Sequence, residues 1–255
     1  MKFLIITIIF LSAQISAREL GQTEITTDEG IEVFKQEKYY LLKKNVEIIS
    51  DEFKLNADLV KAFFNEGLYD VVRIDSTGNV ILKSNRGIKA IGERVDFNVK
   101  DEDIKIYGNK SLLITNEMEM KSDGFIKVNN KSGLFSLEGE NNTLTNQDVY
   151  ISGYFINGSF IKFEEINEIE NLFVEDQIEI NIKTETLDMY SLKAKYNKKN
   201  NIIELFENVK IIRDKESIEG DYAIINTLTE SYKVTSTNAN KVKVLLKEKR
   251  EEEDE

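Results

Sequence analysis

KNVEIISDEFKLNADLV, residues 44–60, is the stretch that decides the fold of this chain. Apolar and polar side chains alternate at 46–48, and a polar turn follows at 50–52. The next segment ends in a small residue and an acid, Ala57 and Asp58. Alternation with a period of two is typical of a half-buried β-strand, and a polar cluster between two such runs is typical of a turn. The stretch therefore predicts a strand, a turn and a second strand.

This unit recurs along the chain at nearly fixed spacing. In 44–60 the asparagine of Asn-Val precedes the small residue by twelve positions, and the same spacing returns in ENVKIIRDKESIEGDYA at 207–223. A looser copy, GNVILKSNRGIKAIGERV at 78–95, has a spacing of thirteen. Repetition of one small unit predicts a fold made of stacked copies, because a single copy cannot bury its own apolar face.

The composition removes most catalytic chemistry. The 255 residues include no histidine and no cysteine, so an imidazole base, a thiolate nucleophile and a zinc site made of these ligands are excluded. The formal net charge of -12 disfavours a nucleic acid partner, which needs clustered basic side chains. A carboxylate-based glycan hydrolase is the enzymatic alternative. The sequence favours a protein that is not an enzyme, with no metal and no cofactor.

The N-terminus has the layout of a secretory signal peptide. A basic start precedes the apolar run FLIITIIFL at 3–11 and the small, polar segment SAQISA at 12–17. This order predicts cleavage of residues 1–17 and a periplasmic mature protein, because the apolar run is shorter than the ~20 residues of a membrane-spanning helix. An uncleaved anchor and a buried helix are the alternatives. At the other end, the charged residues 247–255 predict a disordered tail.

Strand patterns fill most of the chain between these ends. Residues 54–69 alone would suit a helix, but their counterpart at 218–232 is β-branched and rich in turn residues, so both are interpreted as hairpins. A period-four apolar pattern at 160–174 predicts one short helix between two halves. The chain is accordingly divided into an N-terminal β unit, 18–160, and a C-terminal β unit, 161–246, which is allowed to continue the first.

Strands with one apolar face need a facing layer. Two facing sheets, a barrel or a ladder would supply one. The predicted fold class is therefore all-β and antiparallel, with an open sandwich or a folded-over sheet favoured among these. The inward-facing candidates are Val46, Ile48, Leu55, Ala57, Val80, Leu82, Ile88, Ala90, Val95, Phe97, Ile104, Ile106, Val209 and Ile211, with Ile218, Ala223, Ile225 and Val234 in the last repeat. These residues make either an ordinary dry core or a groove for lipid acyl chains, and alternation alone does not choose between the two.

Taken in order, the motifs resemble a known family. ITTDEGIEVF, KNVEII, LNADLV, GNVIL, ENVKII, IEGDYAIINTLTESYKV and the closing NKVKVLL are similar to segments of the OstA-like, or LptA, family of periplasmic lipopolysaccharide-transport proteins. The likeness extends over 24–246 and is weakest at 109–175. It implies a folded-over sheet of the β-jellyroll type that shields acyl chains between its two layers. It also implies that the protein carries lipopolysaccharide or a related glycolipid from the inner to the outer membrane, with the inward candidates from Val46 to Ile211 as the lipid-binding residues.

The resemblance also implies partners. These are an inner-membrane export complex subunit, an outer-membrane translocon, and further copies of the chain joined head to tail through exposed sheet edges. The joining edges would be the first strand, expected over 25–33, and the last, expected over 241–246, with Ile25, Ile31, Val33, Val242 and Val244 as joining residues. The alternative within the same export system is a non-catalytic scaffold, either an anchored LptC-like subunit or the periplasmic part of the translocon.

Overall fold

A computed structural model describes residues 21–67, 70–85, 87–116, 118–147, 149–161, 168–214, 216–237 and 241–246. The predicted signal peptide and the predicted C-terminal tail lie outside these residues. The described chain contains one three-residue 3-10 helix, η1 (Lys198–Asn200), and eighteen strands. The strands are β1 (Glu24–Thr26), β2 (Ile31–Phe34), β3 (Tyr39–Ile49), β4 (Phe53–Phe64), β5 (Val71–Ser84), β6 (Lys89–Asn98), β7 (Asp103–Tyr107), β8 (Ser111–Ile114), β9 (Met118–Ser122), β10 (Phe125–Asn129), β11 (Leu134–Asn146), β12 (Val149–Ile161), β13 (Glu168–Lys183), β14 (Asp188–Asn197), β15 (Ile202–Arg213), β16 (Glu216–Asn226), β17 (Ser231–Thr235) and β18 (Lys243–Leu246).

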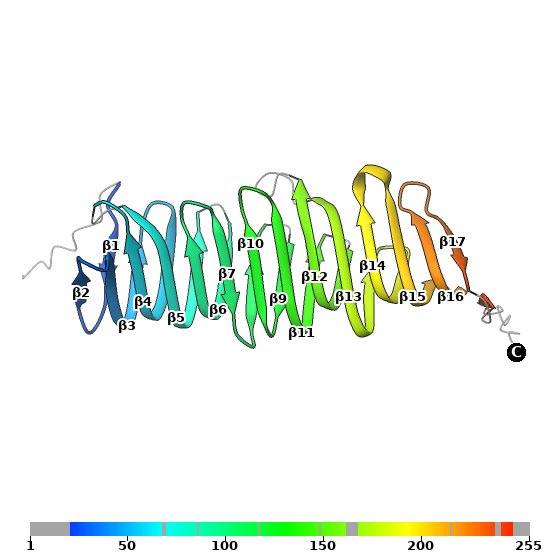
Figure 1. The fold of residues 1–255 in the computed structure, drawn as a ribbon, viewed down its shortest axis with the longest axis horizontal. Coiled ribbons are helices and arrows are strands. Elements are labelled where there is room, and N and C mark those ends of the chain that lie inside the picture. The colour runs from blue at the N-terminus through cyan, green and yellow to red at the C-terminus, as the bar shows by residue number, and fades with distance from the viewer. Residues whose placement is uncertain are drawn as a thin grey trace, which may run out of the picture.

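These strands form one antiparallel sheet that is folded over into two layers with a shared apolar interior. Layer 1 consists of β1, β8, β9 and β18 with the strand halves that pair with them, and layer 2 consists of β2, β7, β10 and β17 with their paired halves. Figure 1 shows the strands side by side along the long axis, with the first strands at one end and the last at the other. The predicted fold class is confirmed.

Each Asn-Val step lies where a long strand bends from one layer into the other. Asn45, Asn79 and Asn208 have φ angles of 48°, 47° and 54°, and the residue before each also has a positive φ. The pairing register shifts at all three places. Asparagine and glycine tolerate this left-handed conformation better than other residues, which explains their use at the bend. We call these bends the corners.

The small residue of each repeat makes room at the corner. The valine after the asparagine faces the interior and is paired with the small residue of the next strand. A Cβ added to Gly92 would lie 2.6 Å from Cγ2 of Ile106, so glycine leaves space there for a β-branched side chain of the following strand. The paired residues are Val46 with Ala57, Val80 with Gly92 and Val209 with Gly220.

The acid of each repeat ties one corner to its neighbour. Asp58 Oδ2 accepts a hydrogen bond from Asn79 Nδ2 at 2.9 Å, and Asp28 Oδ2 accepts one from Asn45 Nδ2 at 2.6 Å. Asp221 likewise accepts a backbone N–H at the following corner, at 2.8 Å. The repeated asparagine, valine, small residue and acid are therefore the residues that form and connect the corners.

The segment with the competing helix pattern and its counterpart at 218–232 both form strands followed by turns, as predicted. Strand β4 ends at Phe64 and is followed by a turn, and β16 ends at Asn226 before the turn at 227–230. The helix predicted at 160–174 is wrong, because 160–161 are the last residues of β12 and 168–174 belong to β13. Residues 162–167 of the predicted helix lie outside the described chain. The apolar residues that suggested a helix belong to the end of β12 and the start of β13, which pair with a register shift between Ser159 and Phe160.

The strand predicted over 25–33 is in fact two strands, which is a second correction. β1 pairs with the layer 1 half of β3, and β2 pairs with its layer 2 half. The chain turns between them at 27–30, where Gly30 has a φ of 86°. Each layer therefore has its own N-terminal edge. β12 and β13 pair across the predicted boundary at 160/161, and the division into two units stays a prediction.

Candidate functional site

The predicted lipid-binding residues lie between the two layers. Ile88 and Phe97 are half-buried and pack against the core. The other twelve are no more than 9% exposed, namely Val46, Ile48, Leu55, Ala57, Val80, Leu82, Ala90, Val95, Ile104, Ile106, Val209 and Ile211. In the last repeat Ala223 and Ile225 are buried and Ile218 and Val234 are half-buried. The inward orientation follows the predicted alternation, while contact with lipid stays a prediction.

The middle of the chain adds interior residues that the sequence analysis did not identify. They were overlooked because Asn-Val is absent there, and β11 bends at Asn141 and Asn142 instead. The rings of Phe135 and Phe160 stack with their centroids 4.3 Å apart and link neighbouring strands of the interior. The same period-two alternation would have identified this group, which includes Leu113, Met120, Ile126, Phe135, Leu144 and Ile156.

Half-buried apolar side chains lie along the margin opposite the corners, which we call the open margin. Each of them is the inward residue nearest to a hairpin turn, so the interior is least covered along this line. Burial raises the pKa of one of them, Tyr196. The sequence analysis named only two members of this group. Layer 1 contributes Phe53, Ile88 and Val149, and layer 2 contributes Phe97, Ile169 and Tyr196.

Edge strands lie at the two ends of the stack (Figure 1). They carry exposed apolar side chains. β1 and β2 form the N-terminal edges, and β18 and β17 form the C-terminal edges of layers 1 and 2. The predicted joining residues Ile25, Ile31, Val33, Val242 and Val244 are 37% to 52% exposed. Leu245 and Leu246, which were not predicted, are exposed beside them. The β17 edge was also missed, because only the last strand was considered.

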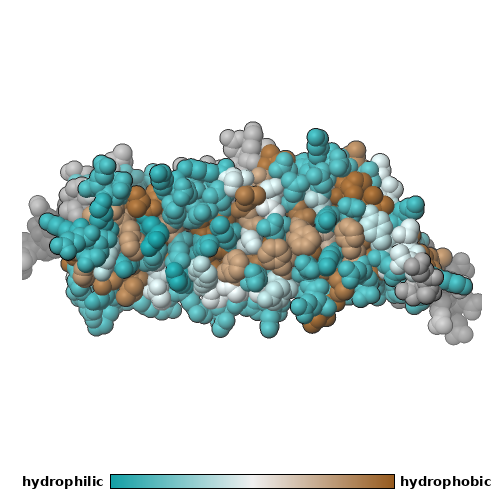
Figure 2. Space-filling model, viewed as in Figure 1, coloured by the Kyte–Doolittle hydropathy of each residue, from teal (hydrophilic) through white to brown (hydrophobic). Residues whose placement is uncertain are grey.

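Charged side chains are confined to the outer faces, the turns and the corners of the described chain, since its buried polar residues are serines and one asparagine. Figure 2 shows hydrophilic side chains over most of one face, with apolar ones scattered among them. At the first corner Lys44 Nζ lies 2.6 Å from Glu29 Oε1, and this contact lowers the pKa of Glu29 and raises that of Lys44.

No group of three or more potential metal-ligating side chains gathers in the described part of the chain. None of its helical segments has the length and apolar character to cross a membrane.

Comparison with known proteins gives a fold-level likeness. No family model matches this sequence, and no curated protein matches it. Matching solved structures include that of LptH, described as the LptA-homologous periplasmic component of the lipopolysaccharide transport device from Pseudomonas aeruginosa. The match has 12% identity and a TM-score of 0.42, and it covers 51% of this chain and 95% of the other. Likeness at this level carries no argument about function.

Proposed function

We propose that this chain is a non-enzymatic periplasmic carrier or bridge that shields the acyl chains of lipopolysaccharide, or of a related glycolipid, between its two layers. The observation that carries the proposal is the apolar interior, which continues from strand to strand along the stack and is least covered along the open margin. The resemblance of the sequence motifs to the OstA-like family supports the same function.

The energetics of acyl burial favour this use of the interior. Each CH₂ group removed from water contributes about 0.8 kcal/mol, so a chain of roughly a dozen carbons would gain on the order of 10 kcal/mol. That gain is offset by the cost of separating side chains that are closely packed near the corners. Entry at the open margin costs least, because Ile88 and Phe97 are already half-exposed there.

Photo-crosslinking in cells tests the proposal. A photoreactive phenylalanine derivative placed at Ile88 or Phe97 should form an adduct with lipid, since both side chains face inward and have room at the open margin. The matched controls are Lys89, on the outer face of β6, and Lys105, on the outer face of the neighbouring strand β7. The proposal fails if the inward positions give no lipid adduct, or no more of it than the outward ones.

Edge pairing would let the carrier act as a bridge. Exposed edges at both ends allow another chain to add its strand by main-chain hydrogen bonds. An inner-membrane export complex subunit, an outer-membrane translocon and further copies of this chain are the proposed partners. Ile25 and Val244 lie on the two edge strands of layer 1, so cysteines at these positions of separate copies should crosslink if the copies join head to tail. Absence of this crosslink would remove self-association and leave lipid binding untouched.

A second candidate is a scaffold of the same export system that holds no lipid. The specific observation in its favour is the close packing of the interior near the corners, where Val80, Ile106 and Leu205 are 0% exposed. The same photo-crosslinking experiment separates the two functions. Protein adducts at the edge strands without lipid adducts at the open margin would support the scaffold.

A further inference from the structure

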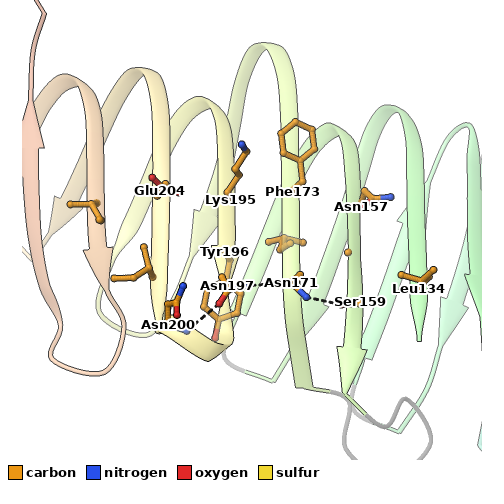
Figure 3. Close-up of a pocket in the computed structure, with 14 residues that line it drawn as sticks. Leu134, Asn157, Ser159, Asn171, Phe173, Lys195, Tyr196, Asn197, Asn200 and Glu204 are labelled. Carbon is orange, nitrogen blue, oxygen red and sulfur yellow. Dashed lines mark hydrogen bonds between the residues drawn. The ribbon is translucent and has the colours of Figure 1, made fainter. Parts of the chain in front are cut away.

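A depression of about 640 Å³ lies on the outer face of layer 2, and we call it the outer depression. It crosses strands β11 to β16, and Figure 3 shows its lining side chains in two rows. The volume is in the range typical of small-ligand sites. Its polar side chains alternate with buried residues along their strands and point away from the interior, while Tyr196 of the open margin and the buried Leu172 also border it. The rows contain Leu134, Asn157, Ser159, Asn171, Phe173, Lys195, Asn197 and Glu204, and Tyr196 and Asn200 lie beside them.

The lower row in Figure 3 is a chain of amides held in fixed orientations. Asn171 Nδ2 donates to Ser159 Oγ at 3.2 Å, and Asn197 Nδ2 donates to Asn171 Oδ1 at 2.9 Å. Asn197 Oδ1 also accepts the backbone N–H of Asn200 at 3.1 Å, which caps η1. An asparagine side chain has two donor hydrogens and two acceptor lone pairs, so each amide retains hydrogen-bonding capacity for a ligand.

The upper row supplies free polar groups beside an aromatic ring. The Asn157 side chain has no hydrogen-bond partner in the described chain, and Lys195 Nζ has no carboxylate partner there and lies 5.6 Å from the ring centre of Phe206. Phe173 packs edge to face against Phe155, with centroids 6.3 Å apart. Glu204 is already engaged as the acceptor of the Tyr222 hydroxyl, at 2.6 Å. An unpaired amide, an ammonium and a ring therefore lie together on neighbouring strands.

This chemistry selects among ligand classes. Among the described residues that line the depression, a phosphate or carboxylate ligand would meet one cation, Lys195, and the negative charge of Glu204 on the adjacent strand. A hydrocarbon chain would leave the amides desolvated and unpaired, which is costly. A sugar offers hydroxyl pairs for the amides and apolar C–H faces for the ring of Phe173. We propose that the outer depression binds an uncharged saccharide, independently of any lipid in the interior.

Titration of the mature chain with uncharged trisaccharides of glucose and of N-acetylglucosamine tests this proposal, with binding followed by NMR shifts or calorimetry. Saturable binding with a dissociation constant of about 1 mM or tighter is expected for at least one probe. Asn157→Ala and Phe173→Ala should each weaken binding roughly tenfold. Ser136→Ala is the matched control, because Ser136 is the register neighbour of Asn157 outside the depression, and it should leave binding unchanged.

Three results would overturn the saccharide site. They are the absence of saturable binding by both trisaccharides, equal binding by the two depression variants and the Ser136→Ala control, and tighter binding of inorganic phosphate than of either sugar. Circular dichroism of each variant shows whether the sheet is intact, so a folding defect is not mistaken for loss of the site. Lipid adducts at Ile88 and Phe97 would be unaffected by any of these outcomes.

Discussion

Replacing Val80 by aspartate probes the interior most sharply, because this side chain is 0% exposed directly after the corner of β5. Loss of the valine removes about 1.5–3 kcal/mol of apolar burial. The new carboxyl group is driven to its protonated form and still costs roughly 1–3 kcal/mol as an unpaired polar group. The free energy of unfolding should therefore fall by about 3–5 kcal/mol, a large share of the 5–15 kcal/mol typical of a folded domain.

Lys83→Asp is the matched control on the same strand half. Lys83 is exposed on the outer face, with Lys54 and Lys89 as its register neighbours, so an added acid relieves repulsion there. Its effect should stay within about 0.5 kcal/mol. Urea unfolding followed by circular dichroism measures both variants, and the midpoint of Val80→Asp should drop by on the order of 2 M. Equal midpoints for the two variants would refute the assigned register and the two-layer interior.

Three further changes test the corners and the outer surface. Gly92→Val should destabilise the fold by about 1–3 kcal/mol in urea unfolding, since its Cβ would meet Ile106 at 2.6 Å; unchanged stability would contradict the role of the small residue. The hydrogen bond to Glu204, burial and the charge of Glu204 together raise the pKa of Tyr222 to about 12. Glu204→Gln should therefore shift one tyrosine in a spectrophotometric titration part of the way toward the ordinary value, and an unaltered titration would contradict this contact. Burial raises the pKa of Asp75, so the folded state holds this proton more tightly than the unfolded chain does. The free energy of unfolding should therefore fall as the pH rises above about 4. Asp75→Asn should lack this fall. Identical pH profiles of unfolding for wild type and Asp75→Asn would show that this carboxyl group is not perturbed.

The repeated unit predicted the strands and their inward faces because both depend on local alternation. Residues 46–57 have the expected strand, turn and strand, and the predicted inward residues Val46, Ile48, Leu55 and Ala57 are buried in the core. The corner itself was not predicted. Two consecutive residues with positive φ, at Lys44 and Asn45, bend the strand without ending it, and a period-two pattern carries no information about such a bend.

The errors have the same origin, since they arise where pairing partners are distant in sequence. One expected edge strand became β1 and β2 because they pair with different halves of β3. The helix expected at 160–174 was wrong because pairing with neighbouring strands and a register shift decide which side of the sheet Ile169 and Leu172 face. The outer depression was missed for a related reason, because its amides come from three separate strands and from η1, and meet only in the folded sheet.

The central claim is that lipid acyl chains bind between the two layers. Native mass spectrometry tests it most directly, with the purified protein mixed at micromolar concentration with intact lipopolysaccharide and, separately, with the same molecule after removal of its acyl chains. The account predicts a protein–lipid complex with the intact molecule and none with the deacylated one. Equal amounts of complex from both molecules, or no complex with intact lipopolysaccharide, would contradict it.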